Sequence, residues 1–123
     1  IGITQLPDAL NVTSLPWPIQ YQPTNAGFLM LVEDLSNSIA PGTNLKAYVT
    51  CAPNAPFGWN EVPLVESTPH LAMGEVGNKK KIRCLYGSVP LTSVGQSLRW
   101  NIVSTGGVMP VLQSVTLYGY GTP

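Results

Sequence analysis

Side chains able to support catalysis are few in this chain of 123 residues, and their spacing is unfavourable. His70 is the single histidine, and no second histidine or cysteine pair lies at a metal-binding spacing from it, so we expect it to be structural or simply exposed. Glu33 and Asp34 are adjacent on a predicted strand, where neighbouring side chains point to opposite faces and cannot share one substrate. Asp34 is expected to cap the following turn, with a calcium ligand as the alternative. The sequence therefore predicts no catalytic residue, no cofactor and no metal site.

One basic cluster comprises Lys79, Lys80, Lys81 and Arg83. A nucleic-acid site would need aromatic stacking partners beside these charges, and only Tyr86 is near. Charged side chains on an exposed strand commonly guard against edge-to-edge association, so we interpret the cluster as a solvated strand face with Arg83 pointing outward. An anionic glycan or the acidic surface of a neighbouring subunit is the alternative partner. Six basic and six acidic residues cancel, which argues against nucleic acid as a partner.

Aromatic side chains are better candidates for binding than the charged ones. A loop tip carries Phe57 and Trp59, and the C-terminal end carries Tyr118 and Tyr120 on one strand phase. These four residues are the predicted ligand or receptor contacts, because loops at the end of a sandwich commonly bind and exposed aromatic rings stack on sugars. For Trp59, packing at the end of the sandwich is the competing interpretation. Trp17 lies between two prolines and is predicted to be an assembly contact.

The elements that would position these residues are strands. The segment from Leu98 alternates strictly, with Leu98, Trp100 and Ile102 pointing one way, which predicts a half-buried strand with Trp100 in the core. Similar patterns, one of them unbroken and apolar on both phases, predict six strands at 27–33, 45–51, 59–66, 79–86, 98–104 and 111–118. With 12 glycines and 12 prolines between short strands, the chain is predicted to be all-β, an antiparallel two-sheet β-sandwich of jelly-roll-like type.

The two cysteines, Cys51 and Cys84, are both predicted to point inward on their strands. A disulfide is possible if the two strands are neighbours or face each other. We favour free thiols, because two cysteines are too few to indicate a disulfide framework.

Proline spacing divides the chain into two parts. Residues 1–25 contain four prolines and are predicted to form an extended N-terminal arm, followed by a β-sandwich domain at 26–123. The first residue is not methionine, so we expect a piece of a longer protein. The apolar run at 26–32 is too short to insert into a membrane. Charged residues make up 10%, below the usual ~25%, which suits either a protein within an assembly or a stable secreted domain.

The order and spacing of six segments resemble the C-terminal β-domain of tail-fibre and other virion structural proteins of tailed bacteriophages. The segments are FLMLVEDL (28–35), TNLKAYVT (43–50), GWNEVPL (58–64), KKKI (79–82), SLRWNI (97–102) and SVTLYG (114–119). Together with their spacing they cover about three quarters of the chain, and none of them is a catalytic signature.

The resemblance implies a non-enzymatic virion module in a tail fibre, the tail or a capsid decoration. Its implied partners are other copies of itself, with a trimer favoured, or other virion proteins, and a host receptor such as a surface glycan. The alternative function is a carbohydrate-binding β-sandwich module of a secreted protein. An upstream fibre repeat would favour the first function, and an adjoining hydrolase domain the second.

Overall fold

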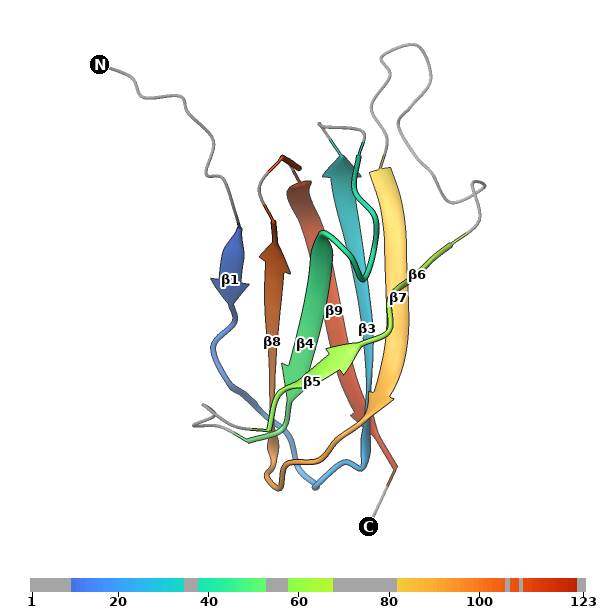
Figure 1. Cartoon of the computed structure of the whole chain (residues 1–123). Coiled ribbons are helices and arrows are strands. Elements are labelled where there is room, and N and C mark those ends of the chain that lie inside the picture. Colours follow the sequence, from blue (N-terminus) through green and yellow to red (C-terminus); the bar gives the residue numbers. More distant parts are fainter. Residues whose placement is uncertain are drawn as a thin grey trace, which may run out of the picture.

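The chain folds into two antiparallel sheets packed face to face (Figure 1). The computed structural model describes residues 10–34, 38–52, 58–67, 82–105, 107–108 and 110–121. Across these residues every regular element is a strand, and none is a helix. The predicted all-β sandwich is therefore confirmed.

The first sheet has the strand order β1-β8-β4-β5 and lies at the front in Figure 1. Its strands are β1 (Asn11–Thr13), β8 (Ser97–Ser104), β4 (Leu45–Thr50) and β5 (Asn60–Val62). A two-residue strand, β2 (Trp17–Pro18), also pairs with β8. Because β8 lies between β1 and β4, its outward side chains are flanked on both sides by those of neighbouring strands.

The second sheet has the order β6-β7-β3-β9. Its strands are β6 (Val65–Glu66), β7 (Ile82–Pro90), β3 (Asn25–Asp34) and β9 (Pro110–Tyr120). The ten-residue β3 is central, paired with β7 on one side and β9 on the other, as its unbroken apolar run predicts. Pro63 interrupts the strand predicted at 59–66, because proline has no amide to donate, and the two pieces β5 and β6 lie at edges of different sheets.

The inner faces of the two sheets form one core. β3 pairs with β9 and β4 pairs with β8, so the early and late strands are nested as in a jelly-roll-like winding. The largest fully buried side chains include Phe28, Met30, Val32, Leu45, Val49, Val62, Leu85 and Ile102.

The segment from residue 10 to residue 25 runs along its own domain (Figure 1). Beyond the β1 and β2 pairings, the amide of Ser14 donates to the carbonyl of Trp100 at 2.9 Å, and that of Ile19 donates to Gln96 at 2.9 Å. The amide of Thr24 then donates to Tyr120 at 3.1 Å. The proline-rich segment 10–25 is extended because its backbone forms hydrogen bonds with β8, with the residue before β8 and with the end of β9.

Three predicted side-chain placements differ from the structure. Trp100 is half-buried at the margin of the core, where it packs against the buried cluster, while Ile102 is fully buried. Arg83 was expected to point outward and Cys84 inward, but the β3–β7 register reverses both directions. Arg83 pairs with Val32, whose side chain faces the core, and Cys84 pairs with Leu31 on the outer face. Cys84 is nevertheless buried.

The alternation expected along the last strand also shifts. A bulge in the β3–β9 pairing, between Leu31 and Val32, leaves Gln113 as an extra residue. Leu112 on one side of it, and Val115 and Leu117 on the other, consequently pack against the core.

An ion-pair network allows Arg83 to lie inside. Its guanidinium donates to Asp34 Oδ2 at 2.9 Å and makes two bonds to the Glu66 carboxylate, at 2.6 and 2.8 Å. The Glu66 hydrogen bond is the main cause that raises the pKa of Arg83. Asp34 Oδ2 also accepts from the amide of Ile39 at 3.0 Å. A carboxylate so engaged is a poor calcium ligand. The predicted cap of the turn at 35–36 lies outside the described residues.

We predict that Phe28→Ala lowers the free energy of unfolding by about 3–5 kcal/mol, because the ring is buried between the sheets and its removal leaves a cavity. Trp17→Ala is the matched aromatic control. Its side chain is 72% exposed, so the loss should stay within about 0.5 kcal/mol. Urea denaturation measures both, and equal losses would contradict the assignment of the core.

We predict that Arg83→Met lowers the free energy of unfolding by about 3 kcal/mol, because the Asp34 side chain is 1% exposed and would lose its ion pair with Arg83. Glu66→Gln, at the more exposed partner, should cost under about 1 kcal/mol. Denaturant midpoints distinguish the two. A loss under about 1 kcal/mol for Arg83→Met would show that Asp34 does not depend on Arg83.

Candidate functional site

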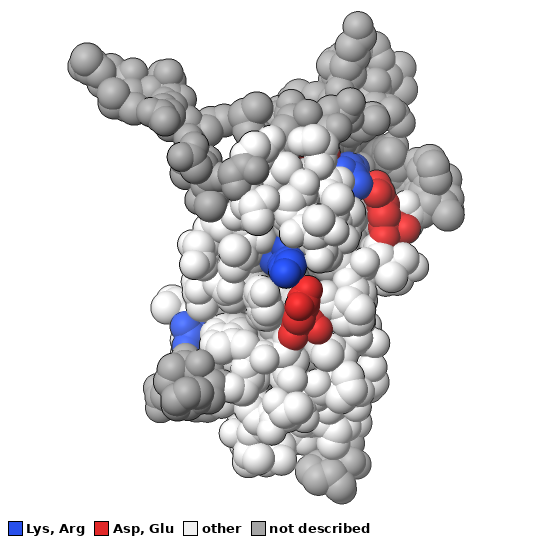
Figure 2. Space-filling view, in the orientation of Figure 1, with Lys and Arg blue, Asp and Glu red and all other residues white. Residues whose placement is uncertain are grey.

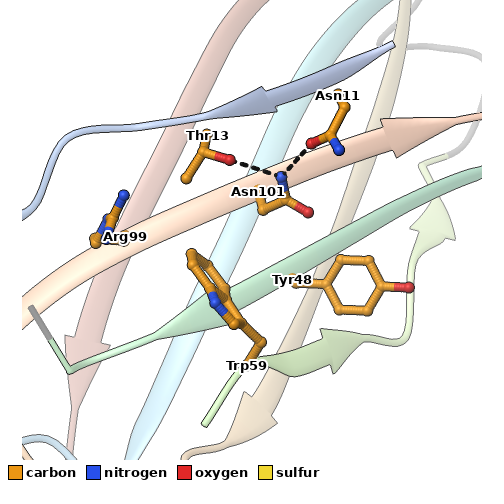
Figure 3. A pocket seen from close by; sticks show the side chains of 6 residues that line it. All are labelled: Asn11, Thr13, Tyr48, Trp59, Arg99 and Asn101. Atoms are coloured by element: carbon orange, nitrogen blue, oxygen red, sulfur yellow. Dashed lines mark hydrogen bonds between the residues drawn. The ribbon is translucent and has the colours of Figure 1, made fainter. Parts of the chain in front are cut away.

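A groove opens on the outer face of the first sheet (Figure 3). It has a volume of about 510 Å³, within the ~300–1,000 Å³ common for small-molecule sites. Its lining residues are Asn11, Thr13, Tyr48, Trp59, Arg99 and Asn101. They come from β1, β4, β8 and the segment before β5, so the groove crosses the sheet.

Strand alternation explains why polar side chains gather there. Leu98 and Ile102 point into the core. Arg99 and Asn101 lie on the opposite phase of the same strand and must therefore point outward. On β4 the same rule buries Ala47 and Val49 and directs Tyr48 outward, directly opposite Asn101 in the β4–β8 register. The outward direction of these side chains is therefore the counterpart of the core pattern.

Trp59 is held in place from two sides. Gly58 before it has φ +82°, a left-handed conformation that suits glycine, and a side chain there would meet Cβ of Ser93 at 2.7 Å. Across the indole, the Arg99 guanidinium carbon lies 5.8 Å from the ring centroid, a cation–π distance. Arg99 is itself positioned, because its Nε donates to the Ser14 carbonyl at 3.1 Å. The indole is thus oriented before any ligand arrives.

Asn101 ties β1 to the wall of the groove. Its Nδ2 donates to Asn11 Oδ1 and to Thr13 Oγ1, both at 2.8 Å (Figure 3), and to the Val12 carbonyl at 3.3 Å. These bonds order three polar side chains from two strands. Residues of the N-terminal segment consequently contribute directly to the site.

A second aromatic surface lies on the outer face of the other sheet. Tyr118 and Tyr120 lie side by side with ring centroids 6.0 Å apart, and Tyr118 is 53% exposed. A side chain at position 27 would overlap the Tyr118 ring, so glycine there lets the ring lie across β3. Tyr86 of β7 and Val65 of β6, which are paired in register, extend the exposed apolar surface.

The predicted ligand contacts therefore do not form one site. Trp59 lies in the groove, whereas Tyr118 and Tyr120 lie on the other sheet, and Phe57 is outside the described residues. Trp17, the predicted assembly contact, is exposed beside a smaller hollow shared with Leu15, Leu98, Trp100 and Leu117. Sequence reasoning missed Asn11, Thr13, Tyr48, Arg99 and Asn101, although the outward phases of 45–51 and 98–104 already contained three of them.

Charged side chains contribute little to this surface. Figure 2 shows that charged side chains are sparse on the face that carries the first sheet. Within the described ranges, no three side chains of histidine, cysteine, aspartate or glutamate are grouped to hold a metal ion. His70 and Lys79–Lys81 fall outside those ranges.

The cysteines are free, as favoured from the sequence, and both are buried. Cys51 Sγ donates to the Ser93 carbonyl at 3.2 Å, and the Cys51 amide donates to Ser93 Oγ at 3.2 Å. These bonds hold Ser93, which lies against Gly58. Burial raises the pKa of the Cys84 thiol above its ordinary value. Both thiols consequently suit packing rather than redox chemistry.

Comparison with known proteins adds no family. No family model, curated protein or solved structure matches the chain. Among the described residues, no helix has the length and apolar character needed to cross a membrane.

We predict that neither thiol reacts readily with Ellman's reagent in the folded protein near neutral pH, and that two thiols per chain react after denaturation. A raised pKa keeps Cys84 protonated in the fold while an unfolded thiol ionises, so its contribution to stability falls as pH rises into the alkaline range. Rapid reaction of one native thiol would contradict its burial.

Proposed function

We propose that the chain is a non-enzymatic structural module of a bacteriophage virion, within a tail fibre, the tail or a capsid decoration. It associates with copies of itself, as a trimer, and presents a surface to the host cell. The sequence resemblance motivates the virion context. The observation that carries the association is the open edge of β9.

β9 is the longest of the described strands, with 11 residues, and it pairs with β3 along one side. Along its other side, the described residues supply partners only near the C-terminal end, where Tyr21 and Thr24 donate to the carbonyls of Gly119 and Tyr120. Proteins usually protect such edges with lysine, proline or short strands. β9 contains no charged residue, and its single proline is its first residue. An edge of this kind favours association.

The surroundings of β9 favour association with a second copy of the same chain. Leu15 and Trp17 are exposed near the face of β9 that carries Leu117. Tyr118 and Tyr120 are exposed on the opposite face of β9. Symmetric association brings identical side chains close to the axis, which is unfavourable for like charges and tolerable for neutral ones. Three copies around an axis beside β9 would bury apolar area without charge repulsion.

The engagement of the buried acids supports a non-enzymatic role. Asp34 is bound to Arg83, and the Glu33 carboxylate accepts from Gln113 Nε2 at 3.2 Å. These carboxylates support the fold, and neither lines the groove.

A second candidate, a carbohydrate-binding module of a secreted protein, is favoured by the groove around Trp59. The two candidates differ in association, because a secreted module can act as a monomer, whereas the virion module requires its copies.

We predict that the domain has about three times its 13.1 kDa chain mass in light scattering at micromolar concentration. Thr116→Lys places a charge on exposed β9 and should shift the protein to monomer. Thr43→Lys, the same change at an exposed turn residue, should leave the mass unchanged. A wild-type monomer would contradict the virion proposal and favour the secreted module.

A further inference from the structure

We propose that the groove lined by Trp59, Tyr48 and Asn101 binds an uncharged oligosaccharide. That the sugar belongs to a host-surface glycan rests on the proposed function. That the groove binds a neutral sugar is argued from the groove residues alone.

The aromatic part of the groove suits the C–H face of a sugar ring. An aromatic face carries negative partial charge and attracts weakly positive C–H groups. The Trp59 indole is half-buried and already oriented by Arg99 and by the Gly58 turn. Little side-chain entropy is therefore lost when a ring stacks on it. Figure 3 shows Tyr48 beside it, from the neighbouring strand.

The polar part suits hydroxyl groups, which both donate and accept. Asn101 Nδ2 is used within the protein, and Oδ1 of the same amide has no protein partner among the described residues. The same holds for Nδ2 of Asn11, the hydroxyl of Tyr48 and Nε1 of Trp59, so donors and acceptors are both left to solvent in one groove. A sugar can replace that water with matching hydrogen bonds.

Charge argues against other ligands. Among the six described residues that line the groove, Arg99 alone is charged, and its guanidinium is engaged with the Trp59 ring and the Ser14 carbonyl. Nucleic acid requires several cations along its phosphates. A peptide added as a strand requires an open edge, whereas β8 and β4 below the groove are paired on both sides. A neutral, hydroxyl-rich ligand remains.

The test is a titration of the full chain with neutral oligosaccharides, monitored by calorimetry and by tryptophan fluorescence. The sugars are maltohexaose, cellohexaose, chitohexaose, mannohexaose and a neutral bacterial O-antigen fragment. We expect at least one to bind at millimolar concentration or below. Trp59→Ala should weaken that binding at least about tenfold, which corresponds to ~1.4 kcal/mol. Tyr48→Phe keeps the ring and should weaken it about two- to tenfold. Trp17→Ala, an exposed tryptophan outside the groove, should change it less than about twofold.

Thermal midpoints establish that each variant is folded, and Tyr48→Phe decides the question if Trp59→Ala does not fold. Binding of none of the five sugars, or binding that both groove variants leave unaffected, would overturn the inference. Failure here is distinguishable from failure of the proposed function: a trimer that binds no sugar contradicts only the inference, and a monomer that binds sugar through Trp59 contradicts only the virion module.

Discussion

Burial of the inner face of β3 against β4 and β8 is the constraint on which the rest of the molecule depends. Phe28, Met30 and Val32 are completely or almost completely buried, and so are Ala47 and Val49 facing them from the other sheet. A strand that buries alternate residues must direct the others outward. The core pattern therefore determines both outer surfaces, one polar and aromatic, the other apolar.

The two outer surfaces differ because their strands have different neighbours. On the first sheet, β1 and β2 cover the β8 side, which leaves a paired, stable floor for the groove. On the second sheet, β9 ends the order, and within the described part of the chain its outer edge is paired only near its C-terminal end. The N-terminal segment thus separates the two roles that we propose. It contributes Asn11 to the groove and covers the β8 edge, whereas its described residues bond to β9 only near the C-terminal end of that strand.

Much of the fold was predictable because its signals are local. Alternation at 98–104 and the two-sided apolar run at 27–33 predicted two of the core strands, and the run is consistent with the central position of β3. The position of Arg83 was not predictable, since the partner that stabilises it, Asp34, is 49 residues away. β1 was not predicted, because a strand of three residues is too short to show an alternating pattern. The register shift at Gln113 was not predicted either, because a bulge depends on the partner strand. The groove was only partly predictable, since strand phase gives direction but not which strands are neighbours.

Hydrogen exchange of the β9 backbone amides, measured as a function of protein concentration, tests most directly whether copies associate through this edge. Amides that point away from β3 between Val111 and Leu117 should exchange slowly at concentrations where the protein associates, and much faster after dilution to monomer. Amides of β4 and β8, paired on both sides, should be unchanged by dilution. Exchange along β9 that is equally fast at every concentration, in a sample shown to be oligomeric, would contradict the account.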